Sequence, residues 1–339
     1  MYGQKLQMSL ALVSVKRSLA KLERFRKSAN DRLLESVSRF NKNRGQVEER
    51  IERVTRSFAL SPVSLDPAGL VGKLEHVLDT YDTHLKTEVK TLASNASEAE
   101  VNTLTNQLEV SIGLDTMYRV VRHYYLLARK QGGLFALAQL QMALPIIMEE
   151  AEAYSAAIDA FAQGKPVGDG VGPLVASKLA QGTQANEIFP ETTVYNLAFE
   201  GRELIVVRAK GPGGTVGKPG SAVEKLIKEN GPIKLVLTVD AALKFEGEPS
   251  GVVAEGTGAA IGGPGTERYH IEEAASMRSI PLTAVVVKMS SKEAISTMTP
   301  LIEKGADQAA RRVKELILAR TSPGDRVIVA GVGNTVGIA

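Results

Sequence analysis

Apolar residues recur in steps of three and four along the first 60 positions of the chain. The stripe is formed by Leu12, Val15, Leu19, Leu22, Leu33, Val37, Val47, Ile51 and Val54. This spacing is typical of a long helix with one apolar seam, as in a coiled coil. Arg26 and Arg44 interrupt the seam, and Gly45 is a candidate break. We therefore predict a coiled-coil-like helical stalk over residues 1–60, paired within the chain or with a second copy; a single helix packed on the next domain is the alternative.

Helical periodicity continues after a break at residues 61–67. Asp66 and Pro67 form a good cap and first turn for a new helix. The pattern predicts helices over residues 67–93, 97–110, 113–131 and 133–163. The sequence thus indicates an all-helical domain over residues 66–163.

The pattern changes at residue 164, where glycine becomes frequent and short apolar runs appear. We expect strands at 193–201, 202–209, 233–239, 280–289 and 325–334. Helices are expected between them at 171–180, 221–230, 268–279 and 292–320, the last broken near Pro300. Strands that alternate with helices indicate a mostly parallel sheet covered on both faces. Residues 164–339 are therefore predicted to form an α/β domain, with a hairpin turn at Glu200–Gly201.

Composition narrows the classes of function. The chain has no Cys, which excludes disulfides, thiolate metal sites and cysteine catalysis and fits a cytoplasmic protein. A formal net charge of +3 argues against a nucleic-acid partner. Residues 1–60 carry 14 Lys and Arg against 6 Asp and Glu. This local excess suits either an anionic membrane surface or a solvated helix. We expect self-association through the N-terminal helix.

Four glycine-rich loops adjoin the predicted strands and helices, at residues 165–173, 210–220, 255–265 and 331–337. Glycine lets backbone amides approach a ligand closely. We expect the loops to converge on one site, with ligand contacts from Gly168, Gly170, Gly211, Gly213, Gly214, Thr257, Gly258, Gly263, Gly333 and Asn334. None of the loops matches a phosphate-binding Walker sequence or a dinucleotide-binding fingerprint.

Two acidic residues in these regions are candidate catalytic groups. Asp169 lies in the first loop, and Asp240 ends the apolar run that begins at Ile233. Neighbouring carboxyls can split their pKa values and act as acid and base on a water, or hold a divalent metal. Glu255 and His270 flank the third loop and would complete a metal set with the two Asp residues. The alternatives are structural: Asp169 as a helix cap and Asp240 as a cap of a turn.

Residues 220–243 and 255–287 resemble the spore germination protease, which has a strand ending in Asp-Ala, a Thr-Gly loop and a following Ile-Pro strand. The related hydrogenase maturation endopeptidases carry a strand with a GxGN loop, followed by Gly-Asp-x-Gly-x-Gly and a helix. Here GDGVGPLVASKLA occupies 168–180 and VIVAGVGN occupies 327–334. The resemblance implies a phosphorylase/hydrolase-like fold in circularly permuted order. It also implies that Asp169 and Asp240 match the acids that act in catalysis or metal binding. Gly256 stands where the germination protease has an acid.

The whole chain, from YGQKLQ near its start to GVGNTVGIA at its end, resembles an uncharacterised archaeal family. That resemblance implies a membrane anchor upstream of this chain and a position on the cytoplasmic face of the membrane. The leading hypothesis for function is a peptidase-like hydrolase in which Asp169 and Asp240 activate water, with or without a divalent metal. The alternatives are a non-enzymatic membrane-associated oligomeric scaffold or ligand-binding protein, and a nucleotide- or phosphate-binding protein.

Overall fold

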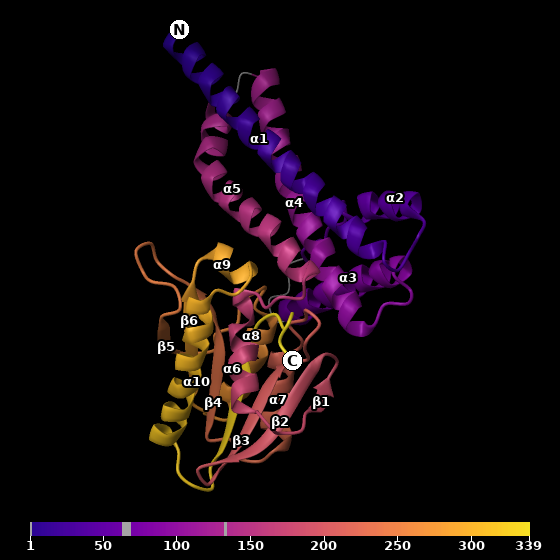
Figure 1. The fold of residues 1–339 in the computed structure, drawn as a ribbon. Helices are drawn as coiled ribbons and strands as arrows, with labels where there is room; N and C mark the ends of the chain where they lie inside the picture. The colour runs from indigo at the N-terminus through magenta and orange to yellow at the C-terminus, as the bar shows by residue number, and fades with distance from the viewer. Residues whose placement is uncertain (1, 63–68, 132–133) are drawn as a thin grey trace.

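A long helical bundle stands on one end of an α/β domain (Figure 1). The structure is a computed structural model, and it describes residues 2–62, 69–131 and 134–339. The all-helical N-terminal region and the mixed α/β C-terminal domain agree with the sequence prediction. The predicted cap at Asp66 and Pro67 and the predicted start of a helix at residue 133 lie outside the described residues. No described helix combines the length and the apolar character needed to cross a membrane.

The helical region contains five helices within the described residues: α1 (Tyr2–Val37), α2 (Arg44–Val54), α3 (Leu70–Leu92), α4 (Glu98–Gln131) and α5 (Leu134–Ala162). The apolar seam of α1 is buried against α4 and α5 through Val15, Leu22 and Ala29. The predicted stalk is therefore divided between α1, which packs in a bundle with α4 and α5, and α2, which packs beside α3. The break between α1 and α2 precedes Gly45, because Asn43 caps α2 by accepting a hydrogen bond from the amide of Gln46.

One predicted interruption of the helical region is wrong. The pattern indicated separate helices on either side of residues 111–112, but α4 is continuous from Glu98 to Gln131. Gly113 does not end a helix here. A Cβ atom at Gly113 would lie 2.5 Å from the ring of Tyr154, so the glycine allows α4 and α5 to pack closely. A glycine in a helical pattern can either end the helix or allow another helix to pack closely against it. The periodicity of the sequence does not distinguish these two roles.

The α/β domain is built on a seven-stranded sheet in the order β1-β2-β3-β7-β4-β6-β5. The strands are β1 (Asn186–Phe189), β2 (Thr192–Phe199), β3 (Arg202–Ala209), β4 (Leu235–Leu243), β5 (Val253–Thr257), β6 (Leu282–Met289) and β7 (Arg326–Gly331). The four central strands β3, β7, β4 and β6 are parallel, and β2 and β5 run against their neighbours. The C-terminal strand β7 thus lies in the middle of the sheet.

Helices cover both faces of the sheet, as predicted. The helices α6 (Val171–Leu179) and α10 (Pro300–Arg320) pack on one face, and α7 (Pro219–Glu229) and α8 (Thr266–Met277) on the other. The side chains of β4 contact both helix layers. Leu235, Leu237 and Val239 pack in the core beneath α6 and α10, whereas Val236 packs in the core beneath α7 and α8. A strand buried on both faces reads as a continuous apolar run because successive side chains point to opposite sides. The remaining short elements are a 3-10 turn η2 (Gly168–Gly170) and α9 (Ser291–Ile295).

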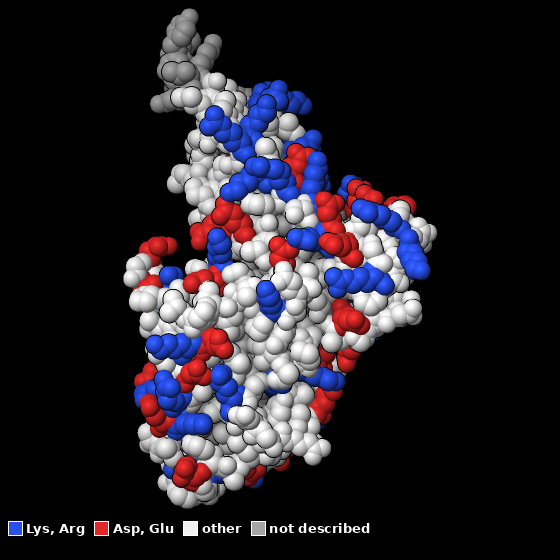
Figure 2. All heavy atoms as spheres, viewed as in Figure 1, with Lys and Arg blue, Asp and Glu red and all other residues white. Residues whose placement is uncertain are grey.

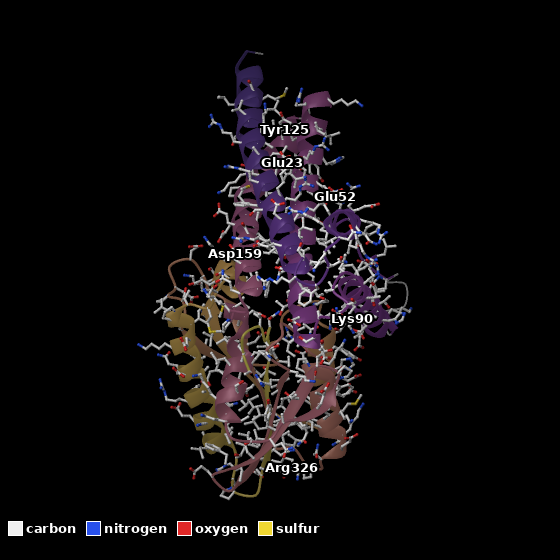
Figure 3. The ribbon with its side chains drawn as sticks, turned by 45° about the vertical axis from the view of Figure 1, so that its right-hand side comes forward. Glu23, Glu52, Lys90, Tyr125, Asp159 and Arg326 are labelled. Carbon is white, nitrogen blue, oxygen red and sulfur yellow. The ribbon has the colours of Figure 1, made fainter. Side chains whose placement is uncertain are left out.

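The carboxyl ends of the parallel strands point toward the helical region. Arg326, at the start of β7, lies at the opposite end of the molecule from the bundle, and Tyr125 lies far along α4 within the bundle (Figure 3). The loops that follow β3, β4, β6 and β7 therefore meet the helices. In open α/β sheets, ligands bind at this edge.

Gly172, at the start of α6, fixes how closely this helix meets the sheet. A Cβ atom there would lie 2.2 Å from the carbonyl oxygen of Val332 and 2.3 Å from that of Val239. We expect Gly172→Ala to lower the free energy of unfolding by about 1–3 kcal/mol, because backbone must move to admit the methyl group.

Gly256→Ala is the matched control, since nothing lies within 4 Å of its Cβ position. We expect the control to change stability by less than about 0.5 kcal/mol. Urea unfolding followed by circular dichroism measures both. Equal effects of the two substitutions would contradict the close approach of α6.

Candidate functional site

Asp169 lies in η2, immediately before α6, at the carboxyl edge of the sheet. Its Oδ2 accepts a hydrogen bond of 2.8 Å from the amide of Asn334, in the loop that follows β7. A Cβ atom at Gly333, whose φ is +133°, would lie 1.9 Å from the carbonyl oxygen of Asp169. Only glycine fits this conformation and this space. The two motif halves at residues 168–180 and 327–334 thus meet, as the permutation hypothesis requires.

Asp240 lies in β4, beside β7. It is buried, and its two carboxyl oxygens accept hydrogen bonds from the amides of Ala241, at 2.7 Å, and Gly262, at 3.1 Å. Burial and the nearby charge of Asp169 raise the pKa of Asp240 well above its usual value, against the opposing effect of the two amides. Burial also raises the pKa of Asp169, against the effect of the Asn334 amide. The two predicted acids are therefore neighbours that interact electrostatically.

Asn334 also connects this edge to the helical region. Its Nδ2 donates to Oδ1 of Asn106 on α4 at 2.9 Å, and its Oδ1 accepts from the amide of Val336 at 2.9 Å. Asn106 in turn donates through Nδ2 to the carbonyl oxygen of Gly214 at 2.6 Å. One side chain therefore links the loop after β7, the Asp169 loop and the helix above them.

A second junction is centred on Glu191, in the turn between β1 and β2. Its carboxylate accepts hydrogen bonds from Lys86 on α3 at 2.7 Å, Asn102 on α4 at 2.7 Å and Thr215 at 2.8 Å. Burial acts to raise the pKa of Glu191, but these partners outweigh it and lower the pKa. These bonds thus hold α3 and α4 against the turn between β1 and β2.

A cavity of about 430 Å³ lies between the helices and the edge of the sheet. Its volume is in the range of small-molecule sites in proteins. Helices α3, α4 and α5 supply one wall, and loops of the α/β domain supply the other. The lining residues are Tyr81, Asn106, Glu109, Val110, Ile112, Gly113, Tyr154, Ala157, Phe161, Val167, Asp169, Val216, Ile295 and Asn334. Asp169 is one of these lining residues, and Asp240 is not.

Glu109 of α4 brings a third carboxyl to the cavity. Its side chain is exposed and lines the cavity. Burial and the charge of Asp82 raise the pKa of Glu109 to about 7, with Lys86 acting in the opposite direction. A carboxyl with a pKa near 7 can take up or release a proton at neutral pH.

Most of the predicted ligand-binding glycines contact the protein itself. Gly168 adjoins Glu293, and Gly170 adjoins Ile338. Similar close approaches to backbone or side-chain atoms surround Gly211, Gly213, Gly214 and Gly333. The first, second and fourth loops are therefore packed together, with the second against α4. The third loop differs, because Gly258 and Gly263 have open space at their Cβ positions and Thr257 is exposed at the end of β5.

The structure does not bring Glu255 and His270 to the two Asp residues. Glu255 forms an exposed ion pair with Arg312 at 2.8 Å, on the edge strand β5. His270 lies on α8 between Glu75, at 3.2 Å, and Glu224, at 2.7 Å. Burial acts to lower the pKa of His270, but the two carboxylates raise it. Among the described residues, no group of three or more His, Asp or Glu side chains could hold a metal ion.

The residues that the sequence prediction missed come from the helical region. Asn106, Glu109, Val110 and Gly113 share one face of α4 at the spacing i, i+3, i+4, i+7. A glycine, an amide and a carboxyl on one helix face are the signal that could have indicated a cavity. The pattern alone does not say which domain that face meets.

We expect Asn334→Ala to lower the free energy of unfolding by about 1–3 kcal/mol, because it leaves Oδ1 of Asn106 without its donor. A double-mutant cycle with Asn106→Ala should give a coupling energy of about 0.5–3 kcal/mol. Urea unfolding of the two single variants and the double variant measures it. Additive effects would show that the two side chains do not interact.

Comparison with known families covers nearly the full chain. Residues 1–164 match the model described as "Protein of unknown function (DUF1512) N-terminal domain". Residues 167–339 match the model described as "Domain of unknown function (DUF1512) C-terminal". No curated protein matches the chain. The boundary between the two family models falls where α5 ends and the α/β domain begins.

Proposed function

The chain belongs to the DUF1512 family of proteins of unknown function, and we propose that it is a hydrolase with acid–base chemistry at the carboxyl edge of the sheet. The observation that carries the proposal is the pair of Asp169 and Asp240. Asp169 lines a cavity, and burial together with the charge of Asp169 raises the pKa of Asp240. Two neighbouring carboxyls with separated pKa values supply an acid and a base at one pH.

The two environments suggest which carboxyl holds the proton. Asp240 is buried and next to another acid, so its neutral form is favoured. Asp169 would be the ionised member, since it is reached from the cavity and receives the amide of Asn334. In this proposal Asp169 takes a proton from a water as that water attacks the carbonyl carbon of an amide, and it gives that proton to the amide nitrogen as the C–N bond breaks, which leaves a carboxylic acid and an amine. Because Asp240 is protonated, no second negative charge lies beside Asp169, and Asp169 can remain ionised and act as the base.

A peptide or amide is the substrate class that we favour. The arrangement of the Asp169 loop beside the loop after β7 agrees with the resemblance to the germination protease and the hydrogenase maturation endopeptidases. Nothing in the cavity favours a nucleotide or a phosphate, because its described lining has no Lys or Arg to neutralise the negative charge.

The proposal requires no metal. A divalent cation prefers several carboxylate or carbonyl oxygens converging on one point. Here both oxygens of Asp240 accept backbone hydrogen bonds, and Glu255 and His270 have partners elsewhere. The donor set present does not fit a dedicated metal site.

Substitution of either acid tests the proposal. The full chain should cleave members of a mixture of short peptides with free or blocked N-termini, with products identified by mass spectrometry. We expect Asp169→Asn to reduce the rate about 10²–10⁴-fold, which is the usual contribution of a general base, and Asp240→Asn to shift the pH dependence of the rate.

Asp307→Asn serves as the control, because Asp307 lies on α10 in a surface ion pair with Lys178. Its activity should equal that of the unmodified chain. Absence of cleavage of any peptide, or full activity of Asp169→Asn, would overturn the proposal.

A second candidate function is attachment to a membrane surface as a scaffold. Phe135, Met142 and Ile146 lie on one face of α5 and are 76%, 80% and 69% exposed. Lys and Arg side chains gather over the upper part of the same bundle (Figure 2). Exposed apolar residues beside basic residues favour binding to an anionic lipid surface. The seam of α1 is buried within the chain, so self-association would have to use another face, such as this one.

Sedimentation with phosphatidylserine vesicles tests the second candidate. The full chain should sediment with the vesicles, and replacing Phe135, Met142 and Ile146 with Ser should release it. Phe58→Ser is the control, since Phe58 is 75% exposed and follows α2 rather than lying on α5. Equal binding by all three proteins would exclude a role of the α5 face.

A further inference from the structure

The polar groups of the cavity differ in whether they are free to meet a ligand. The amides of Asn106 and Asn334 are engaged with each other, with Gly214 and with Val336. Asp169 and Glu109 are the carboxyls that face the cavity, from opposite walls. Tyr154 and other aromatic rings occupy much of the remaining helical wall. The cavity therefore offers a ligand negative or acceptor groups and aromatic faces.

No Lys or Arg lies among the described residues that line the cavity. The cation close to Glu109 is Lys86, which bonds Glu191 at 2.7 Å and Asp82 at 3.1 Å. Lys86 is thus committed to the junction between the two domains. Among the described residues that line the cavity, Glu109 and Asp169 therefore have no cation of their own, and a cationic group of a ligand could pair with them.

We propose that the cavity binds a primary ammonium group carried on an apolar body. The ammonium would lie between Glu109 and Asp169, and the apolar body would contact Tyr154, Phe161 and Val110. Carboxylates and aromatic faces together attract an organic cation, and the apolar wall favours a hydrophobic attachment. The N-terminus of an apolar peptide has this chemistry, as does a free arylalkylamine. Calling this ligand a substrate rests on the proposed function, whereas binding itself does not.

A bound ammonium should also change the protonation of the site. Glu109, with its pKa at about 7, is partly protonated at neutral pH. A cation next to it favours the ionised form, so binding should release a proton. The charged and titratable groups around Glu109 are Asp82, Lys86 and Tyr81 on α3, Tyr154 on α5, and Asp169 on the opposite wall of the cavity. Proton release gives the inference a readout that does not depend on catalysis.

Isothermal titration calorimetry of the full chain at pH 7 tests the inference with three probes. They are phenylalanyl-alanine amide, its N-acetylated form, and 4-phenylbutylamine. We expect at least one amine to bind about tenfold or more tightly than the acetylated peptide, and its binding heat to vary with the ionisation enthalpy of the buffer. The two amines distinguish a peptide N-terminus from a free amine. Equal binding of the acetylated peptide, or no binding of either amine at millimolar concentration, would overturn the proposal.

Two variants locate the binding within the cavity. Glu109→Gln should weaken amine binding about tenfold or more and abolish the proton release. Val216→Trp should block the cavity without a change of charge, because Val216 lines it and is 55% exposed. Glu149→Gln, at an exposed position of α5, is the matched control and should leave binding unchanged. Amine binding that survives both cavity variants would contradict the assignment.

The same experiments separate the two proposals. Amine binding that depends on Glu109, together with full activity of Asp169→Asn, would overturn the hydrolase and leave the binding site. Loss of activity in Asp169→Asn without any preference for amines would overturn the binding site alone.

Discussion

Asn334 makes the contacts on which the site depends. Its backbone amide donates a hydrogen bond to the carboxyl of Asp169, and its Nδ2 donates to Oδ1 of Asn106 in the helical region. Its Oδ1 accepts a hydrogen bond from the amide of Val336. Asn334 lies only a few residues after β7, the last strand of the chain, which is inserted between β3 and β4. The site therefore forms only when the C-terminal strand has taken its place in the sheet and the helices have docked on the edge.

Docking of the helical region converts an open sheet edge into a cavity and changes its electrostatics. Helices α3, α4 and α5 cover the loops after the parallel strands, and the hydrogen bonds at Glu191 and Asn106 hold them there. Burial raises the pKa of Asp169, Asp240 and Glu109 because a charged carboxyl is less well solvated in the covered site. Three acids with raised pKa values around one covered site are unusual for a purely structural junction, since perturbed groups cluster at functional sites.

The sequence predicted the centre of the α/β domain well because a strand such as β4 is buried on both faces and its apolar run ends at an acid, whereas the short, partly exposed edge strand β1 was not predicted. Asp240 was predicted as a site candidate because it ends such a run, and Asp169 because it lies in a glycine loop, whereas the contact between residues 168–180 and 327–334 was implied by the resemblance to the peptidases. Glu109 was missed because a helix face does not reveal what it packs against. The predicted break between residues 110 and 113 was wrong, and Gly113 instead lies against Tyr154, on a helix about 40 residues later in the chain. The glycine loops were predicted to contact a ligand, but three of them pack against one another. Such packing depends on tertiary contacts that the local sequence does not reveal.

The most direct test of this account is a titration of the Asp240 carboxyl, followed by carbon-13 NMR in the full chain and in the Asp169→Asn variant. The account predicts a pKa for Asp240 well above the ordinary Asp value of about 3.9, and a lower pKa when the charge of Asp169 is removed. A pKa near the ordinary value that does not change with Asp169→Asn would show that the two acids do not form a pair.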